Sequence, residues 1–315
     1  MSRKPLSNVP ASIRSRLLNL AKERKEDFSY LLSRYASDRF LYRLSLSRYH
    51  KQFILKGATL FRVWNGEPHR ATKDLDLLSF GVNEIPHLVE IFKEICCIKY
   101  EQDGILFQEE TVVGEKIKED QEYEGVRIKL KGILSNTPVP LQIDVGFGDA
   151  VTPTATEASF PTILSLPVPV MQIYPRETVV SEKFQAMVSL GIKNSRLKDF
   201  YDILFLCGNF NFEGVLLSQA IQATFQRRKT SIPNTEPFAL TVEFAEDSDK
   251  KKQWEAFVKK AGINVNQNSL NEVIDIIKSF LMPPCLAVSQ NQVFNQIWTP
   301  AEGWQVSDFN SIPRS

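Results

Sequence analysis

The sequence has few of the residues that build disulfide-linked or histidine-rich metal proteins. Its 315 residues include four cysteines and three histidines, and two of the cysteines, Cys96 and Cys97, are adjacent. This spacing forms neither a disulfide framework nor a paired zinc motif. We therefore expect a reducing, cytoplasmic location. A metal hydrolase built on histidines would be short of ligands.

Long uncharged hydrophobic runs are also missing. No stretch approaches the roughly 18 apolar residues that a membrane helix needs. The first residues, Met1 to Pro5, lead into charged helical sequence and not into the apolar core of a signal peptide. We expect no membrane segment. The hydrophobic fraction of 43% and the charged fraction of 24% are those of an ordinary globular protein.

Charge is unevenly distributed along the chain. Residues 1–51 contain 12 lysines and arginines against 4 acidic residues, whereas the remaining residues contain 26 against 33. A basic segment attached to an acidic body favours attraction to polyanions such as nucleic acid. A solvated helical face is the alternative explanation.

Hydrophobic periodicity divides the chain into three segments. It predicts basic N-terminal helices over residues 1–51, a mixed α/β core over 52–170 and a mostly helical domain over 171–315. Asp27 is the expected N-cap of the second helix. The predicted helices lie near 11–25, 27–48, 59–64, 86–97, 176–190, 197–207, 249–261 and 268–281, the predicted strands near 53–55, 75–78, 105–113, 124–134 and 140–147, and a predicted loop or linker near 152–170.

Three acidic residues on predicted strands carry the main chemical signal. Asp74 and Asp76 are two residues apart, so a strand would project both carboxylates from one face. Two carboxylates this close repel each other unless a cation lies between them, and magnesium prefers such hard oxygen ligands. Asp144, flanked by Ile143 and Val145, could complete a two-metal site.

A glycine turn supplies what this group of acids lacks. Gly57, Ala58 and Thr59 follow a short apolar strand and open a predicted helix. Backbone N–H groups at such a helix start, together with the Thr59 hydroxyl, can hold a triphosphate. The combination predicts a site for a nucleoside triphosphate (NTP) and Mg²⁺.

At this point the sequence resembles a known group of proteins. The order of motifs is similar to the nucleotidyltransferase superfamily of DNA polymerase beta, and more closely to the AbiEii/AbiGii toxin family. The motifs span about residues 50–260. They are Leu55-Lys56-Gly57-Ala58-Thr59-Leu60-Phe61-Arg62, Thr72-Lys73-Asp74-Leu75-Asp76-Leu77-Leu78, Gln142-Ile143-Asp144-Val145-Gly146-Phe147-Gly148-Asp149, Tyr174-Pro175-Arg176-Glu177-Thr178, Glu182-Lys183-Phe184, Lys198-Asp199-Phe200-Tyr201-Asp202-Ile203 and Trp254-Glu255-Ala256-Phe257.

The resemblance implies a polymerase-beta-like mixed sheet core flanked by helices and a magnesium-dependent transfer of a nucleoside monophosphate from an NTP. Some members of the family are understood to modify the acceptor end of tRNA and so stop translation. The toxin is typically encoded beside an antitoxin, often a DNA-binding repressor, in bacterial phage defence by abortive infection. One position departs from the family pattern, because Ala58 stands where glycine or serine is usual.

The resemblance also assigns later residues. Lys183 would contact the triphosphate or the leaving pyrophosphate, and its side chain is expected to be partly exposed, so that its removal should hardly change stability. Asp199 and Asp202 lie three residues apart on one helical face, where they could orient Lys183 or act as a base. Helix capping is the alternative for Asp199. Arg62 could be structural or phosphate-facing, and Asp149 is expected to be a turn residue.

Two other functions remain open at this stage. The same fold could transfer a nucleotide to a small molecule, such as an aminoglycoside, or to a protein side chain. The chain could also be a nucleotide-binding module without catalysis, although three acids would not be required for binding alone.

Overall fold

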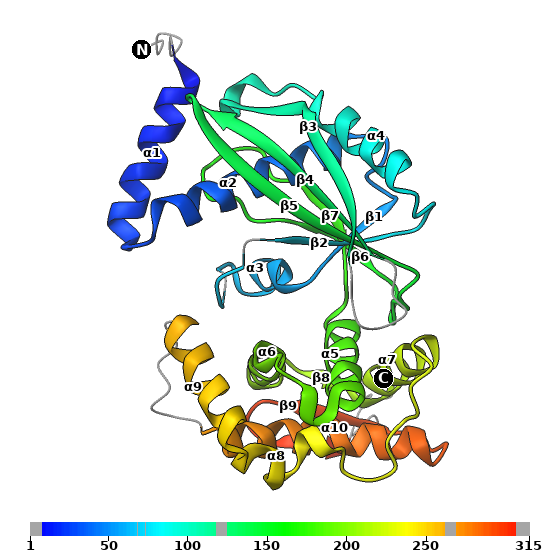
Figure 1. The fold of residues 1–315 in the computed structure, drawn as a ribbon. Helices are drawn as coiled ribbons and strands as arrows, with labels where there is room; N and C mark the ends of the chain where they lie inside the picture. The colour runs from blue at the N-terminus through cyan, green and yellow to red at the C-terminus, as the bar shows by residue number, and fades with distance from the viewer. Residues whose placement is uncertain (1–7, 68, 73, 118–124, 262–268, 307–315) are drawn as a thin grey trace, which may run out of the picture. The chain divides into compact units, whose positions relative to one another are not determined.

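The computed structural model describes residues 8–67, 69–72, 74–117, 125–261 and 269–306 (Figure 1). The chain divides into two compact units, one formed by residues 1–148 with 156–173 and the other by 149–155 with 174–315. Each unit has its own buried apolar core. The three-segment division of the sequence remains a prediction, and the first two of its segments fall mostly in the first unit.

A seven-stranded mixed sheet forms the centre of the first unit, with strand order β3-β4-β5-β2-β1-β7-β6. The β1–β7 and β2–β5 pairs are parallel and the other pairs are antiparallel. This architecture confirms the expected α/β class. The strands are β1 (Phe53–Lys56), β2 (Leu75–Ser79), β3 (Ile105–Ile117), β4 (Gly125–Leu134), β5 (Thr137–Phe147), β6 (Thr156–Ser159) and β7 (Val170–Ile173).

Two N-terminal helices, α1 (Val9–Arg24) and α2 (Phe28–Leu46), belong to this unit, as do α4 (Ile85–Cys96) and the short turns η1 (Ala58–Leu60), α3 (Phe61–Asn65) and η2 (Glu101–Asp103). Asp27 caps α2 as expected, because its carboxylate accepts a hydrogen bond of 2.8 Å from the backbone N–H of Tyr30. Figure 1 shows α2 running along the sheet, and it contacts both β5 and β7.

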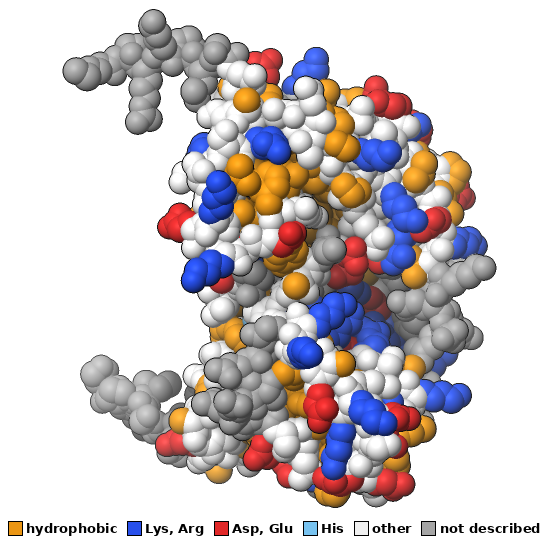
Figure 2. Space-filling view, turned by 60° about the vertical axis from the view of Figure 1, so that its left-hand side comes forward, with side chains coloured by type: hydrophobic (Ala, Val, Ile, Leu, Met, Phe, Trp, Pro, Cys, Tyr) orange, Lys and Arg blue, Asp and Glu red, His pale blue; other side chains and the backbone are white. Residues whose placement is uncertain are grey.

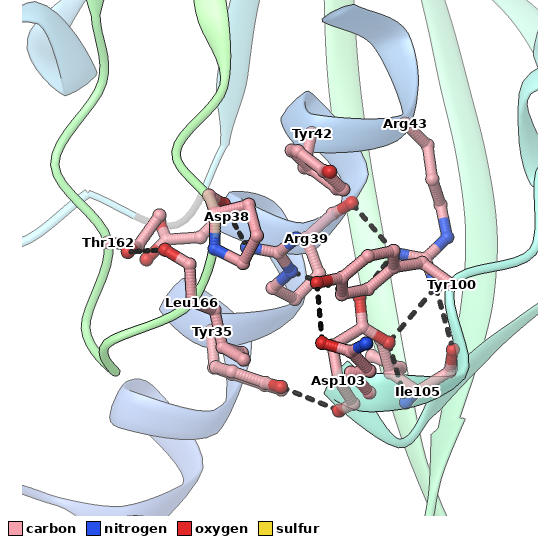
Figure 3. Close-up of polar contacts among 12 residues, drawn as sticks. Tyr35, Asp38, Arg39, Tyr42, Arg43, Tyr100, Asp103, Ile105, Thr162 and Leu166 are labelled. Carbon is pink, nitrogen blue, oxygen red and sulfur yellow. Dashed lines mark hydrogen bonds and ion pairs between the residues drawn. The ribbon is translucent and has the colours of Figure 1, made fainter. Parts of the chain in front are cut away.

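The buried face of α2 is unusually polar (Figure 3). Arg39 and Arg43 both bind the buried carboxylate of Asp103, with N–O distances of 3.0 Å from Arg39 Nε and 2.6 Å from Arg43 Nη1. Tyr35 donates a hydrogen bond of 2.6 Å to the carbonyl oxygen of Asp103, and burial raises the pKa of its phenol. These contacts attach the helix to the 3₁₀ turn that precedes β3.

This cluster changes the interpretation of the basic N-terminal segment. Arg34, Arg39 and Arg43 supply part of its positive charge, yet all three side chains are buried in ion pairs with acids. Figure 2 shows a surface on which lysine and arginine lie among acidic and apolar side chains. Net charge along the sequence therefore overstates the positive charge that reaches the surface.

The expected loop at 152–170 contains a strand, so this prediction was wrong in part. Thr156–Ser159 forms β6 and pairs antiparallel with β7. The strand has three exposed residues out of four, so it lacks the apolar alternation that marks strands in a sequence. It is a strand because it pairs with β7 at the edge of the sheet.

The second unit is mostly helical, as expected, and α5 has the predicted bounds. Its helices and 3₁₀ turns are α5 (Arg176–Leu190), η3 (Gly191–Lys193), α6 (Leu197–Asn209), α7 (Gly214–Arg227), η4 (Phe238–Leu240), α8 (Val242–Glu246), α9 (Ser248–Ala261) and α10 (Leu270–Ser289). Within the described residues, no helix is both long enough and apolar enough to span a bilayer.

Two features of this unit differ from the prediction. Helix α7 lies between the predicted helices near 197–207 and 249–261, where no helix was expected. A small sheet of order β10-β9-β8 occupies part of the segment that was predicted to be mostly helical. Its strands are too short to show a period, being β8 (Phe212–Glu213), β9 (Gln296–Thr299) and β10 (Gly303–Val306).

Candidate active site

The glycine turn after β1 lies directly against the first strand of acids. Gly57 has φ +74°, and a Cβ atom added to it would lie 2.0 Å from Asp76 Oδ2. Only a glycine allows this approach, because any side chain would collide with the carboxylate and strain the backbone. The turn and Asp76, predicted separately from the sequence, are therefore brought together.

Ala58 causes no backbone difficulty at the turn. The positive φ falls on Gly57 alone, whereas Ala58 opens the 3₁₀ helix η1. The departure from the family pattern therefore leaves the backbone conformation of the turn intact. Thr59 is only 4% exposed, so the turn offers an anion mainly the backbone N–H groups at the start of η1.

A row of charged residues crosses the sheet beside this turn. Asp144 on β5 is in register with Asp76 on one side and with Arg127 of β4 on the other. The row continues to Lys56 on β1, opposite Asp76, and to Glu115 on β3, opposite Arg127. Directly paired residues project from the same face of a sheet, so all five side chains belong to one face.

Arg127 and Asp144 form a two-pronged ion pair in this row. Arg127 Nε lies 2.9 Å from Asp144 Oδ1, and Nη2 lies 2.8 Å from Oδ2. The hydrogen bonds that Arg127 donates to Asp144 and the nearby negative charges of Asp144, Asp74 and Glu115 raise the pKa of Arg127. Asp74 immediately precedes β2, so its charge reaches this group from the beginning of the strand.

The three acids have the donor chemistry that a divalent cation prefers. All are carboxylates, Asp76 and Asp144 are cross-strand neighbours, and Asp74 is close enough to Arg127 to affect its pKa. Among the described residues, no three acidic, cysteine or histidine side chains are gathered as a ready metal site. Asp144 directs both oxygens to Arg127 in this arrangement.

Arg62 has a structural role in the structure. It binds the two oxygens of Asp38 at 2.6 and 3.1 Å, donates to the carbonyl oxygen of Pro161 and lies over the ring of Phe160. Its residue exposure is 5%. These contacts attach α3 to α2 and to the segment after β6, which decides between the two roles left open by the sequence.

The remaining predicted site residues lie in the second unit, where they contact one another. Lys183 on α5 places its ammonium 2.6 Å from Asp199 and 2.7 Å from Asp202 on α6. Arg196 Nε adds a contact of 2.8 Å to Asp199. The N-cap of α6 is Arg196, so Asp199 is not the cap residue. Both aspartates therefore form ion pairs with Lys183.

Lys183 is more buried than expected. Its side chain is 12% exposed and those of Asp199 and Asp202 are 1% and 0% exposed. Asp149, expected to be a turn residue, is instead an ion-pair partner of Arg228 at 3.2 Å.

Arg127 and Lys56 belong to the charged row but were not expected there from the sequence. Arg127 alternates with the apolar Val126 and Ile128 on a clear strand, which placed it on the polar face. Its position opposite Asp144 depends on the register of β4 and β5, which the sequence does not specify. Lys73, within the acidic motif, lies outside the described residues.

Comparison with known proteins identifies a family. Residues 39–275 match the family described as nucleotidyl transferase AbiEii toxin of type IV toxin–antitoxin systems. Two solved Helicobacter pylori proteins are similar, JHP933 (16% identity, 82% of this chain and 92% of that chain, TM-score 0.45) and a "putative nucleotidyltransferase" (15%, 83% and 95%, 0.44). No curated protein sequence matches. Because the family match covers most of its length, the chain belongs to the AbiEii family of nucleotidyl transferase toxins.

Proposed function

We propose that this enzyme transfers a nucleoside monophosphate from an NTP to tRNA in a magnesium-dependent reaction, as the toxin of a toxin–antitoxin pair. The carrying observation is the contact between the glycine turn and the row of acids, where Gly57 approaches Asp76 and Asp76 neighbours Asp144. A phosphate-holding turn beside paired carboxylates is the arrangement that phosphoryl transfer requires.

Each group of site residues has a separate role in this proposal. Asp74, Asp76 and Asp144 would hold Mg²⁺, which when bound supplies charge neutralisation at the phosphates. The backbone N–H groups after Gly57 orient the triphosphate. An acceptor hydroxyl forms a bond to the α-phosphorus while the bond to pyrophosphate breaks, and a carboxylate, for which Asp144 is proposed, accepts the hydroxyl proton. Lys183 is proposed to contact the leaving pyrophosphate, and Asp199 and Asp202 are proposed to orient it or to act as a base.

The acceptor is proposed from the family and from the basic residues that reach solvent. The described part of residues 1–51 keeps six exposed cations despite the buried arginines. They are Arg16, Lys22, Arg24, Lys25, Arg48 and Lys51. Exposed cations favour a polyanion such as tRNA. Binding of tRNA should then weaken steeply as salt rises, because phosphate contacts release counterions.

Incorporation of label from [α-³²P]NTP into tRNA tests the reaction. Asp76→Asn should abolish labelling, since it removes the carboxylate charge that lies between the glycine turn and Asp144. Glu94→Gln is the matched control, because Glu94 is a half-exposed acid of the same unit that pairs with Arg48 on the surface. Equal labelling by Asp76→Asn and the control would overturn the catalytic assignment. Labelling of a small molecule or a protein, without salt-sensitive binding of tRNA, would show that the acceptor is not tRNA.

The biological setting is a separate part of the proposal. The family consists of toxins of type IV toxin–antitoxin systems, so we propose an antitoxin gene adjacent to this one and a role in abortive infection. Growth arrest on expression of the wild-type chain, relieved by Asp76→Asn and by co-expression of the neighbouring gene, would support it. Arrest that persists in Asp76→Asn would contradict it.

A further inference from the structure

We propose that Arg127 is an exchangeable counter-ion of Asp144, which a divalent cation must displace when it binds the three acids. In this proposal Arg127 and the cation compete for the same two carboxylate oxygens. The inference rests on the proposed function, because it concerns the acids assigned to that site. The family assignment names neither Arg127 nor a competition between Arg127 and the cation.

The first argument is the occupancy of Asp144. Both of its oxygens accept hydrogen bonds from Arg127, at 2.9 and 2.8 Å. Arg127 therefore occupies one lone pair on each oxygen of Asp144, so a cation bound to this carboxylate shares its oxygens with the guanidinium and is repelled by the positive charge of Arg127.

The second argument is the charge balance of the row. Asp144 is in register with Asp76, and carboxylates on neighbouring strands repel each other unless a positive charge compensates them. Arg127 provides that charge on the far side of Asp144. A divalent cation would provide it as well, so either one can compensate the charge of Asp144.

The third argument is the solvent exposure of the Arg127–Asp144 ion pair, which allows its two side chains to separate. The side chains of Arg127 and Asp144 are 32% and 20% exposed, whereas those of the structural pair Arg62 and Asp38 are 6% and 0% exposed. A released Arg127 guanidinium can be solvated at once, because a third of its side chain already faces solvent. Release of Arg62 would leave a buried charge without compensation.

Calorimetric titration of the full-length chain with Mn²⁺ alone tests the competition. Arg127→Gln should bind Mn²⁺ about tenfold more tightly than wild type. In the wild type the ion competes with the charge-assisted bidentate contact between Arg127 and Asp144, and the variant lacks this contact. Lys129→Gln is the matched control. It makes the same charge change two residues along β4, but Lys129 pairs with Glu115 at 2.6 Å and lies opposite Gln142. Its affinity should stay within about twofold of wild type, because solvent and salt screen exposed charges.

Two further variants keep the test decisive. Arg127→Lys keeps the charge without the two-pronged geometry, so its affinity should fall between those of wild type and Arg127→Gln; it decides the question if Arg127→Gln does not fold. In an Asp144→Asn background, Arg127→Gln should no longer raise the affinity, because the coupling passes through the carboxylate.

The outcomes separate this inference from the proposed function. Unchanged or weaker Mn²⁺ binding by Arg127→Gln, or a gain that persists in Asp144→Asn, overturns the competition, while NTP labelling by the wild type keeps the proposed reaction. If neither wild type nor Arg127→Gln binds the ion, the competition and the proposed metal ligands both fail.

Discussion

Asp76 leaves no room for a side chain on Gly57. The carboxylate Oδ2 lies where a Cβ atom of residue 57 would come within 2.0 Å, and the backbone of Gly57 has φ +74°. Gly57 thus meets two requirements at once, a conformation that L-residues rarely adopt and a close approach to a candidate metal ligand. Gly66 and Gly191 also have positive φ, but a Cβ atom added to either would have no atom within 4 Å.

Gly57→Ala should lower both stability and activity. The strained backbone should cost about 1–3 kcal/mol of unfolding free energy, and displacement of Asp76 by an ångström or so should reduce turnover by about 10²-fold. Gly66→Ala is the matched control, because Gly66 has φ +80° with no atom within 4 Å of an added Cβ. Thermal melting and NTP labelling of the two variants provide the comparison. An equal loss of activity in both would show that backbone strain, and not Asp76, is responsible.

The buried Asp103 should be essential for the stability of the first unit. Asp103→Asn keeps the shape but removes the charge that compensates Arg39 and Arg43, both fully or almost fully buried. Leaving buried cations without compensation should cost about 3–5 kcal/mol. Urea unfolding followed by circular dichroism measures the loss. Glu94→Gln, which breaks a surface pair, should unfold as wild type does; an Asp103→Asn curve that coincides with it would contradict the prediction.

Features that depend on local sequence were predictable. The bounds of α5, the Asp27 cap of α2 and the alternation of β4 and β5 follow from side-chain spacing and capping chemistry. Strand β8 has two residues and exists because Phe212 and Glu213 pair with a strand more than 80 residues later. Such pairing leaves no local signal, which is why the small sheet and β6 were missed.

The candidate site shows the same division. The acids and the glycine turn are visible as residue types, but the register that places Asp144 between Asp76 and Arg127 is a property of the folded sheet. The number of basic residues in the N-terminal segment overstated the positive charge of its surface for a related reason. Arg39 and Arg43 were counted toward a basic surface, whereas the fold uses them to compensate one buried carboxylate.

Cys97 should be the first cysteine to react with iodoacetamide at pH 8. Burial raises the pKa of Cys96, Cys207 and Cys285 to about 12, so almost none of each is the reactive thiolate. Cys97 is exposed, although its hydrogen bond to Glu109 raises its pKa as well.

Mass spectrometry after timed labelling of the native chain, with the denatured chain as reference, gives the order of reaction. Glu109→Gln should accelerate labelling of Cys97, because the substitution removes the carboxylate that disfavours the thiolate. Labelling of Cys207 as fast as Cys97 would show that the buried thiol is open to solvent.

Lys183→Ala should be much more damaging to stability than the sequence suggested. A partly exposed lysine can be truncated at almost no cost, but Lys183 is mostly buried and compensates both Asp199 and Asp202, which are themselves buried. Arg196 remains beside Asp199 and is half-exposed. Removal of the ammonium should therefore cost about 3–5 kcal/mol. Lys252→Ala, at an exposed position, should melt as wild type does.

This instability complicates any measurement of a catalytic role for Lys183, so the assay must be made well below the melting temperature of the variant. If the ammonium contacts the leaving pyrophosphate, the folded Lys183→Ala enzyme should turn over about 10²–10³-fold more slowly, since it loses an electrostatic contact that strengthens in the transition state. Melting and NTP labelling should be recorded on one preparation. A folded variant that labels tRNA at the wild-type rate would reduce Lys183 to an ion-pair partner of the two aspartates, and a variant as stable as wild type would contradict the buried ion pairs.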